Sequence, residues 1–83
     1  MAKIIKADGT VENIDKKLTL SCMQSIVGGL IELVYLSNAE VMVVDEEGKL
    51  KNKNVNVRAT HMYANVNDVI VGDVILANTD EID

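Results

Sequence analysis

Four basic side chains lie close together in the middle of the chain and are the first candidates for chemistry. Lys49, Lys51 and Lys53 alternate along the sequence, and Arg58 follows five residues later. Alternate side chains of an extended segment point to the same face, so we expect the three lysines to share one face. Arg58 falls in the first turn of a predicted helix, where unpaired backbone N–H groups attract anions. This pattern predicts a phosphate site; the alternative is a polar edge strand whose lysines block edge pairing.

Three neighbouring side chains extend this candidate site. Asn56 is placed to cap the predicted helix, and Thr60 follows in its first turns. His61 comes three residues after Arg58, which places both side chains on one helix face. A histidine there can stack on a nucleobase or hydrogen-bond a ribose. The alternatives are that Asn56 and Thr60 serve only the helix cap and that His61 is a partly buried helix residue.

Tyr35 and Tyr63 are the only aromatic residues of the chain. Either ring can stack on a nucleobase, an interaction worth ~1–3 kcal/mol per base. The alternative role is core or interface packing, with the hydroxyl group reaching solvent. Together with the basic segment, these rings indicate a small anionic, nucleotide-type ligand.

The residue inventory argues against most enzyme classes. The single histidine and the single cysteine, Cys22, are too few for a four-ligand zinc site or a disulfide. The chain has no Gly-x-Gly-x-x-Gly fingerprint and no Walker-type phosphate loop. We therefore expect no catalytic residues, no metal and no cofactor.

Length and charge bound the remaining possibilities. The chain has 83 residues, a net charge of -5 and a hydrophobic fraction of 48%, which indicates one domain over residues 1–83. Net acidity argues against nonspecific nucleic-acid binding. Residues 59–83 hold five acids and no lysine or arginine, and 78–83 are expected to form a flexible acidic tail.

Turn signals divide the first part of the chain. Asp8-Gly9 between residues 3–7 and 10–14 predicts a β-hairpin with a type I′ turn, in which both central residues have positive φ. Thr19 can cap a helix over residues 20–27, and the following glycine suits the left-handed position that ends it.

The second part reads as strand pairs and one more helix. Residues 30–36 and 41–44 are predicted strands, and 50–54 are expected to be extended and polar. A helix is predicted over 57–64, and the last extended stretch covers 69–77 with a break at Gly72-Asp73. The order ββ-α-ββ-α-β predicts an α+β fold: a small antiparallel sheet with two short helices.

The strand over residues 41–44 is apolar on both sides. Such a strand is buried on both faces, either by a helix layer or by a partner chain. We expect a homo-oligomer on this basis, because a domain near 80 residues is only marginally stable alone.

Nothing in the sequence indicates a membrane protein. No apolar run approaches the ~20 residues needed to span a bilayer, and the N-terminal residues do not resemble a signal peptide. The unpaired thiol fits a reducing compartment. We therefore expect a cytoplasmic location, in the host cell if the protein is phage-encoded.

Four short motifs carry a resemblance to a known family. They are Ile26-Val27-Gly28-Gly29 before a strand, Asp45-Glu46-Glu47-Gly48-Lys49, Asn56-Val57-Arg58-Ala59-Thr60 and Gly72-Asp73-Val74. In this order the chain resembles a family of small proteins of unknown function that is enriched in phages and prophages. It departs from the family pattern at Asp45, where asparagine is expected. The resemblance covers nearly the whole chain.

The resemblance implies a viral or mobile-element accessory protein without implying any chemistry. By analogy with viral proteins that sequester immune signals, we expect an oligomeric, non-enzymatic binder of a small phosphorylated nucleotide signal. The alternative is an inhibitor that binds a host defence or replication protein through an acidic surface or a strand edge.

Overall fold

The structure is a computed structural model that describes residues 2–64 and 67–82. The first element of the fold is a short β-hairpin. Strands β1 (Lys3–Ile5) and β2 (Val11–Asn13) pair antiparallel. Their turn differs from the predicted type I′, because Gly9 has positive φ and Asp8 does not. The N–H of Gly9 donates to the carbonyl of Lys6 at 3.0 Å, and Lys6 N–H donates to Thr10. The register leaves three residues in the loop, which favours a type I turn followed by a left-handed glycine.

Helix α1 (Leu20–Val27) has the predicted bounds and caps. Thr19 Oγ1 accepts a hydrogen bond from the N–H of Cys22 at 3.1 Å. Gly28 ends the helix in the left-handed conformation, with φ of 85°. A residue with a Cβ is strained there, so glycine is the natural choice.

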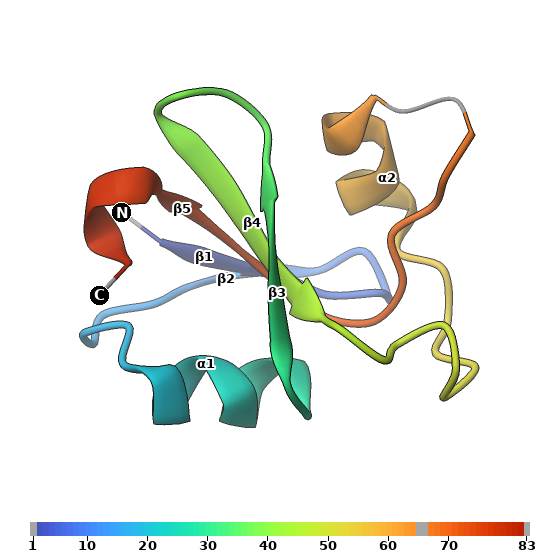
Figure 1. Cartoon of the computed structure of the whole chain (residues 1–83), viewed down its shortest axis with the longest axis horizontal. Helices are drawn as coiled ribbons and strands as arrows, with labels where there is room; N and C mark the ends of the chain where they lie inside the picture. The colour runs from blue at the N-terminus through green and yellow to red at the C-terminus, as the bar shows by residue number, and fades with distance from the viewer. Residues whose placement is uncertain (1, 65–66, 83) are drawn as a thin grey trace.

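The remaining strands complete one antiparallel sheet (Figure 1). Strands β3 (Ile31–Tyr35) and β4 (Glu40–Asp45) form a second hairpin. The last strand, β5 (Val74–Asn78), lies between β1 and β4, so the order across the sheet is β2-β1-β5-β4-β3. The predicted α+β class and the order ββ-α-ββ-α-β are confirmed.

Helix α2 (Val57–Tyr63) follows an irregular connection. Residues 50–54 were expected to be extended, but residues 46–52 form consecutive turns. The N–H of Lys51 donates to Glu47, and the N–H of Lys53 donates to Gly48. Asn52 adopts positive φ, which asparagine tolerates better than most residues. The alternation of lysines therefore does not place them on one strand face.

The sheet is covered on both faces, with α1 on one side and α2 on the other (Figure 1). Val41 and Val43 of β4 pack with Met23 of α1, whereas Met42 and Val44 pack with Ala59 of α2. The two-sided apolar pattern of β4 is thus explained within one chain. It no longer argues for a partner subunit.

The acidic end of the chain is part of the fold up to residue 82. Residues 78–83 were expected to be a frayed tail, but Asn78 belongs to β5 and Thr79–Glu81 form a single 3₁₀ turn. Ile82 packs against the core on the α1 side and bridges to Leu18. Asp83 lies outside the described residues. Among the described helices, none is long and apolar enough to cross a bilayer.

Candidate functional site

Two of the predicted ligand lysines converge on one buried carboxylate. Lys53 Nζ lies 2.7 Å from Asp45 Oδ2, and Lys51 Nζ lies 2.9 Å from the same oxygen. The Asp45 side chain is 1% exposed. The N–H of Glu47 also donates to Asp45 Oδ1 at 2.9 Å. These lysine charges are therefore balanced inside the protein.

The same two lysines contact the end of α1. Lys53 Nζ donates to the carbonyl of Val27 at 2.6 Å, and Lys51 Nζ donates to the carbonyl of Gly28 at 3.2 Å. Carbonyls at a helix C-terminus lack intrahelical partners and carry partial negative charge, so cations are favourable there. A Cβ at Gly29 would lie 2.5 Å from Lys51 Nζ. These contacts connect the end of α1 to residues 46–53. We call the three residues that make them, Lys51, Lys53 and Asp45, the lysine clip.

The electrostatics of the lysine clip appear in the pKa of Asp45. Burial on its own raises the pKa of this carboxyl group. The hydrogen bonds from Lys53, Lys51 and the Glu47 N–H outweigh burial and lower the pKa to about 2. Asp45 therefore remains ionised at any pH near neutrality.

Lys49, the third lysine, is paired elsewhere. Its ammonium group contacts Asp68, which also accepts a hydrogen bond from the N–H of Val69 at 2.8 Å. Both contacts lower the pKa of Asp68 below its ordinary range, and the hydrogen bond from Lys49 has the larger effect. The structure therefore does not bring the three lysines together as a free cationic surface.

Asn56 and Thr60 hold α2 in place. Asn56 is fully buried, and its side-chain amide donates to the carbonyls of Ile5 and Gly72 at 2.9 and 2.8 Å. Its Oδ1 accepts from the N–H of Ala59 at 3.0 Å, which is the predicted cap. Thr60 Oγ1 donates to the Asn56 carbonyl and accepts from the N–H of Ile70. The interpretation of Asn56 as a ligand contact is therefore wrong, because burial and three hydrogen bonds occupy it fully.

The other predicted site residues are spread over the molecule. Arg58 and His61 lie exposed on α2, and Arg58 makes no ion pair with residues 2–64 or 67–82. Tyr63 is half-buried at the end of α2. Tyr35 is 63% exposed at the end of β3, and strand alternation places it on the α1 side of the sheet. The two tyrosines therefore do not flank one pocket.

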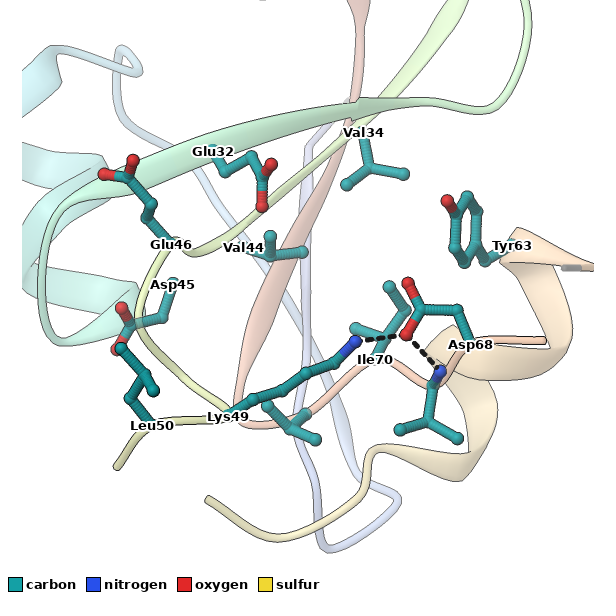
Figure 2. A pocket seen from close by; sticks show the side chains of 12 residues that line it. Glu32, Val34, Val44, Asp45, Glu46, Lys49, Leu50, Tyr63, Asp68 and Ile70 are labelled. Carbon is teal, nitrogen blue, oxygen red and sulfur yellow. Dashed lines mark hydrogen bonds and ion pairs between the residues drawn. The ribbon is translucent and has the colours of Figure 1, made fainter. Parts of the chain in front are cut away.

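A groove lies where α2 and residues 68–71 cover the sheet incompletely. Glu32 and Val34 of β3 line one side of it, and Tyr63 and Asp68 line the other (Figure 2). The enclosed space is about 180 Å³. Its aliphatic lining comes from Val34, Val44, Leu50, Val69, Ile70 and Val71.

Acidic side chains predominate around this groove. Glu32, Glu46 and Asp68 line it, and Lys49 is the one basic lining residue among the described part of the chain. Glu32 and Glu46 are exposed, whereas Lys49 is held by Asp68. The groove therefore suits an apolar group that carries a positive charge better than it suits a phosphate.

Sequence reasoning did not find this groove. Its residues come from β3, from the end of β4 with the turns that follow it (residues 44–50), from α2 and from residues 68–71, so no local motif contains them. One available signal was Leu50, an isolated aliphatic residue in a polar segment, which is 83% exposed at the groove.

The comparison with known families confirms the sequence resemblance. A family model described as a domain of unknown function, DUF3846, matches residues 2–83. The chain belongs to this family. No curated protein and no solved structure matches the DUF3846 chain. The family match confirms the membership predicted from the sequence motifs.

Proposed function

We propose that this DUF3846 protein is a non-enzymatic binding protein whose groove takes an apolar and basic segment of a partner protein. The observation that carries the proposal is the aliphatic groove with exposed carboxylates at its rim, Glu32 and Glu46. An apolar side chain gains by leaving water, and a neighbouring lysine or arginine gains from the rim carboxylates.

The size of the groove supports a side chain as its occupant. Pockets for drug-sized ligands enclose ~300–1,000 Å³, whereas this groove encloses about 180 Å³. That space suits one or two aliphatic side chains. A groove of this kind matches the binding of an extended peptide, in which alternate side chains enter the pocket and the intervening ones meet the rim.

A matched pair of peptides tests this proposal. One nine-residue probe alternates lysine with leucine, and the other alternates glutamate with leucine. We expect saturable binding of the lysine probe, measured by calorimetry, and much weaker binding of the glutamate probe. Equal binding of both probes, or of neither, would contradict the proposal.

Charge reversal at the rim tests whether the lysine probe binds in the groove. We expect the double substitution Glu32→Lys and Glu46→Lys to weaken the lysine probe by about tenfold or more, equivalent to ~1.4 kcal/mol. Asp80→Lys together with Glu40→Lys changes the net charge equally at exposed positions that do not line the groove. These control substitutions should cost several-fold less affinity. Equal losses would indicate nonspecific attraction to the acidic protein.

Sequestration of a phosphorylated nucleotide is the second candidate function. Arg58 supports it, because this guanidinium is exposed and makes no ion pair with the described residues. The pairing of Lys49, Lys51 and Lys53 with carboxylates counts against it. A thermal-shift screen with cyclic and linear nucleotides tests this candidate. A shift that Arg58→Ala removes and Lys16→Ala retains would favour it over peptide binding.

The biological setting we propose follows from the resemblance to phage proteins. A phage-encoded binder of this kind acts in the host cytoplasm, and a host defence or replication protein is its proposed partner. Capture of a host protein by the wild-type chain and not by the Glu32→Lys, Glu46→Lys variant would support that setting. Capture by both would mean that the groove is not the binding surface.

A further inference from the structure

The two edges of the sheet differ in their protection. Strand β2 has three residues, and its central Glu12 forms an ion pair with Lys6, the residue that follows β1. Short, charged edge strands resist pairing with another chain. Strand β3 has five residues, and Glu32 is the one charged residue among them. It contains no lysine and no proline, and its register with β4 is continuous.

The register of β3 shows which backbone groups face outward. Leu36 N–H donates to Glu40, and Glu46 N–H donates to Leu30. In an antiparallel pair, hydrogen-bonded and non-hydrogen-bonded positions alternate. Even-numbered residues of β3 therefore bond to β4. The N–H and C=O groups of Ile31, Leu33 and Tyr35 point away from it, toward the open edge.

We propose that two copies of this chain pair antiparallel through their β3 edges, with Leu33 opposite the partner's Leu33. Only outward-facing residues can form hydrogen-bonded pairs across the new seam. In this register Ile31 also lies opposite the partner's Tyr35, and the relation is reciprocal. All three outward-facing residues of each strand are then used. A shift by two residues in either direction leaves one of them without a counterpart in the other strand.

The side chains of β3 are self-complementary in this register. On the α1 side, Leu33 meets the partner's Leu33, and Tyr35 meets the partner's Ile31. Aromatic and β-branched side chains that lie opposite one another stabilise strand pairs. This contact covers Tyr35, which is 63% exposed in the single chain. On the other face Glu32 lies opposite the partner's Val34, so no two carboxylates are directly opposed. This pattern favours a second copy over a partner of different sequence.

Pairing would also join the two grooves. An antiparallel edge contact with its two-fold axis along the sheet normal keeps both copies of one face on the same side. Glu32 and Val34 line the groove and lie at the seam. The two grooves would then meet at the seam, where each Val34 lies opposite the partner's Glu32. This pairing does not depend on which ligand the groove takes.

Solution mass is the first test. Sedimentation across protein concentrations should show a species of twice 9.0 kDa. We expect Tyr35→Lys to raise the dimer dissociation constant by about tenfold or more, since two lysines would each lose their water at the seam. Val11→Lys makes the same kind of change on the protected β2 edge, where the residue is also exposed. This control should leave the dissociation constant unchanged.

Engineered cysteines test the register. Hydrogen-bonded antiparallel pairs have Cα atoms about 5.5 Å apart, within the range that a disulfide spans. In a Cys22→Ala background, Leu33→Cys should form a cross-linked dimer on oxidation. Ile31→Cys and Tyr35→Cys should each stay uncrosslinked alone and should cross-link when the two variants are mixed. Circular dichroism melting of each variant confirms that it is folded.

Three results would overturn the proposal. The first is a monomer at every concentration up to about 1 mM, where even weak binding is detected. The second is a dimer that Tyr35→Lys leaves intact. The third is a folded Leu33→Cys variant that does not cross-link. Peptide binding by such a monomer would leave the proposed function of the groove standing, so the two proposals fail separately.

Discussion

Asp45 is the residue that decides what the basic segment can do. From the sequence, Lys51 and Lys53 were predicted to be free to bind an anionic ligand. In the structure they already have one, because both contact the buried Asp45 carboxylate and the carbonyls at the end of α1. From the sequence resemblance asparagine was expected at this position, and an asparagine would carry no charge to balance the two lysines.

The pH dependence of stability tests the lysine clip. The pKa of Asp45 is about 2 in the folded chain and near 3.8 without its partners. Its stabilisation of ~2 kcal/mol is present above about pH 4 and is lost as the pH falls through 2. Urea unfolding of the wild type and of Asp45→Asn should therefore differ most above pH 4. The difference should shrink by ~2 kcal/mol between pH 4 and pH 2.

The same substitution at an exposed aspartate is the control for Asp45→Asn. Asp80→Asn removes one exposed carboxylate that makes no contact with the lysine clip. We expect its unfolding free energy to follow the wild type at every pH. A constant difference between the wild type and Asp45→Asn across the whole range would mean that the ion pairs contribute nothing measurable.

At the scale of elements, α2 depends on one buried amide. Asn56 caps the helix and joins it to the carbonyls of Ile5 and Gly72. Loss of a cap costs ~1 kcal/mol, and each buried carbonyl left unpaired adds ~1–3 kcal/mol. We expect Asn56→Ala to destabilise the chain by about 3 kcal/mol or more in urea unfolding. Asn54→Ala, at an exposed position, should change stability by less than about 0.5 kcal/mol.

The same scale shows how far local sequence reasoning reaches. The bounds of α1, the Asn56 cap and the second hairpin were predictable, because caps and turns are set by neighbouring residues. The segment 46–53 was not, since its turns depend on lysines that reach a carboxylate and a helix end elsewhere. The first hairpin was predicted with the wrong turn type, because register and loop length decide between the two.

At the scale of the whole molecule, the position of β5 could not be read from the sequence. Ile75 pairs with Ile4 at one end of the chain and with Val43 in its middle. This insertion makes the last strand central and leaves β3 at an open edge. The groove has the same origin, because its lining comes from four separate segments. Most predicted ligand residues, by contrast, turned out to hold these segments together.

The structure of the whole molecule also shows where the acidic residues lie. The net charge of -5 equals the charge of residues 59–83, of which 78–83 were expected to be a flexible tail. Residues 78–82 are instead part of the fold, and exposed carboxylates also line the groove. We expect the affinity for the lysine–leucine probe to fall as salt rises from 0.05 to 0.5 M, because the Debye length shortens about threefold over that range. Salt-independent affinity would indicate purely apolar binding.

The most direct test of the central claim is an amide chemical-shift titration of the ¹⁵N-labelled protein with two probes in parallel. The lysine–leucine peptide should shift amides of residues 32–34, 46–50 and 68–71, which line the groove, and pyrophosphate should leave residues 49–60 unshifted. If pyrophosphate instead shifts residues 49–60 in a saturable way while the peptide leaves the groove unchanged, the basic segment is an anion site and the groove is not the functional surface.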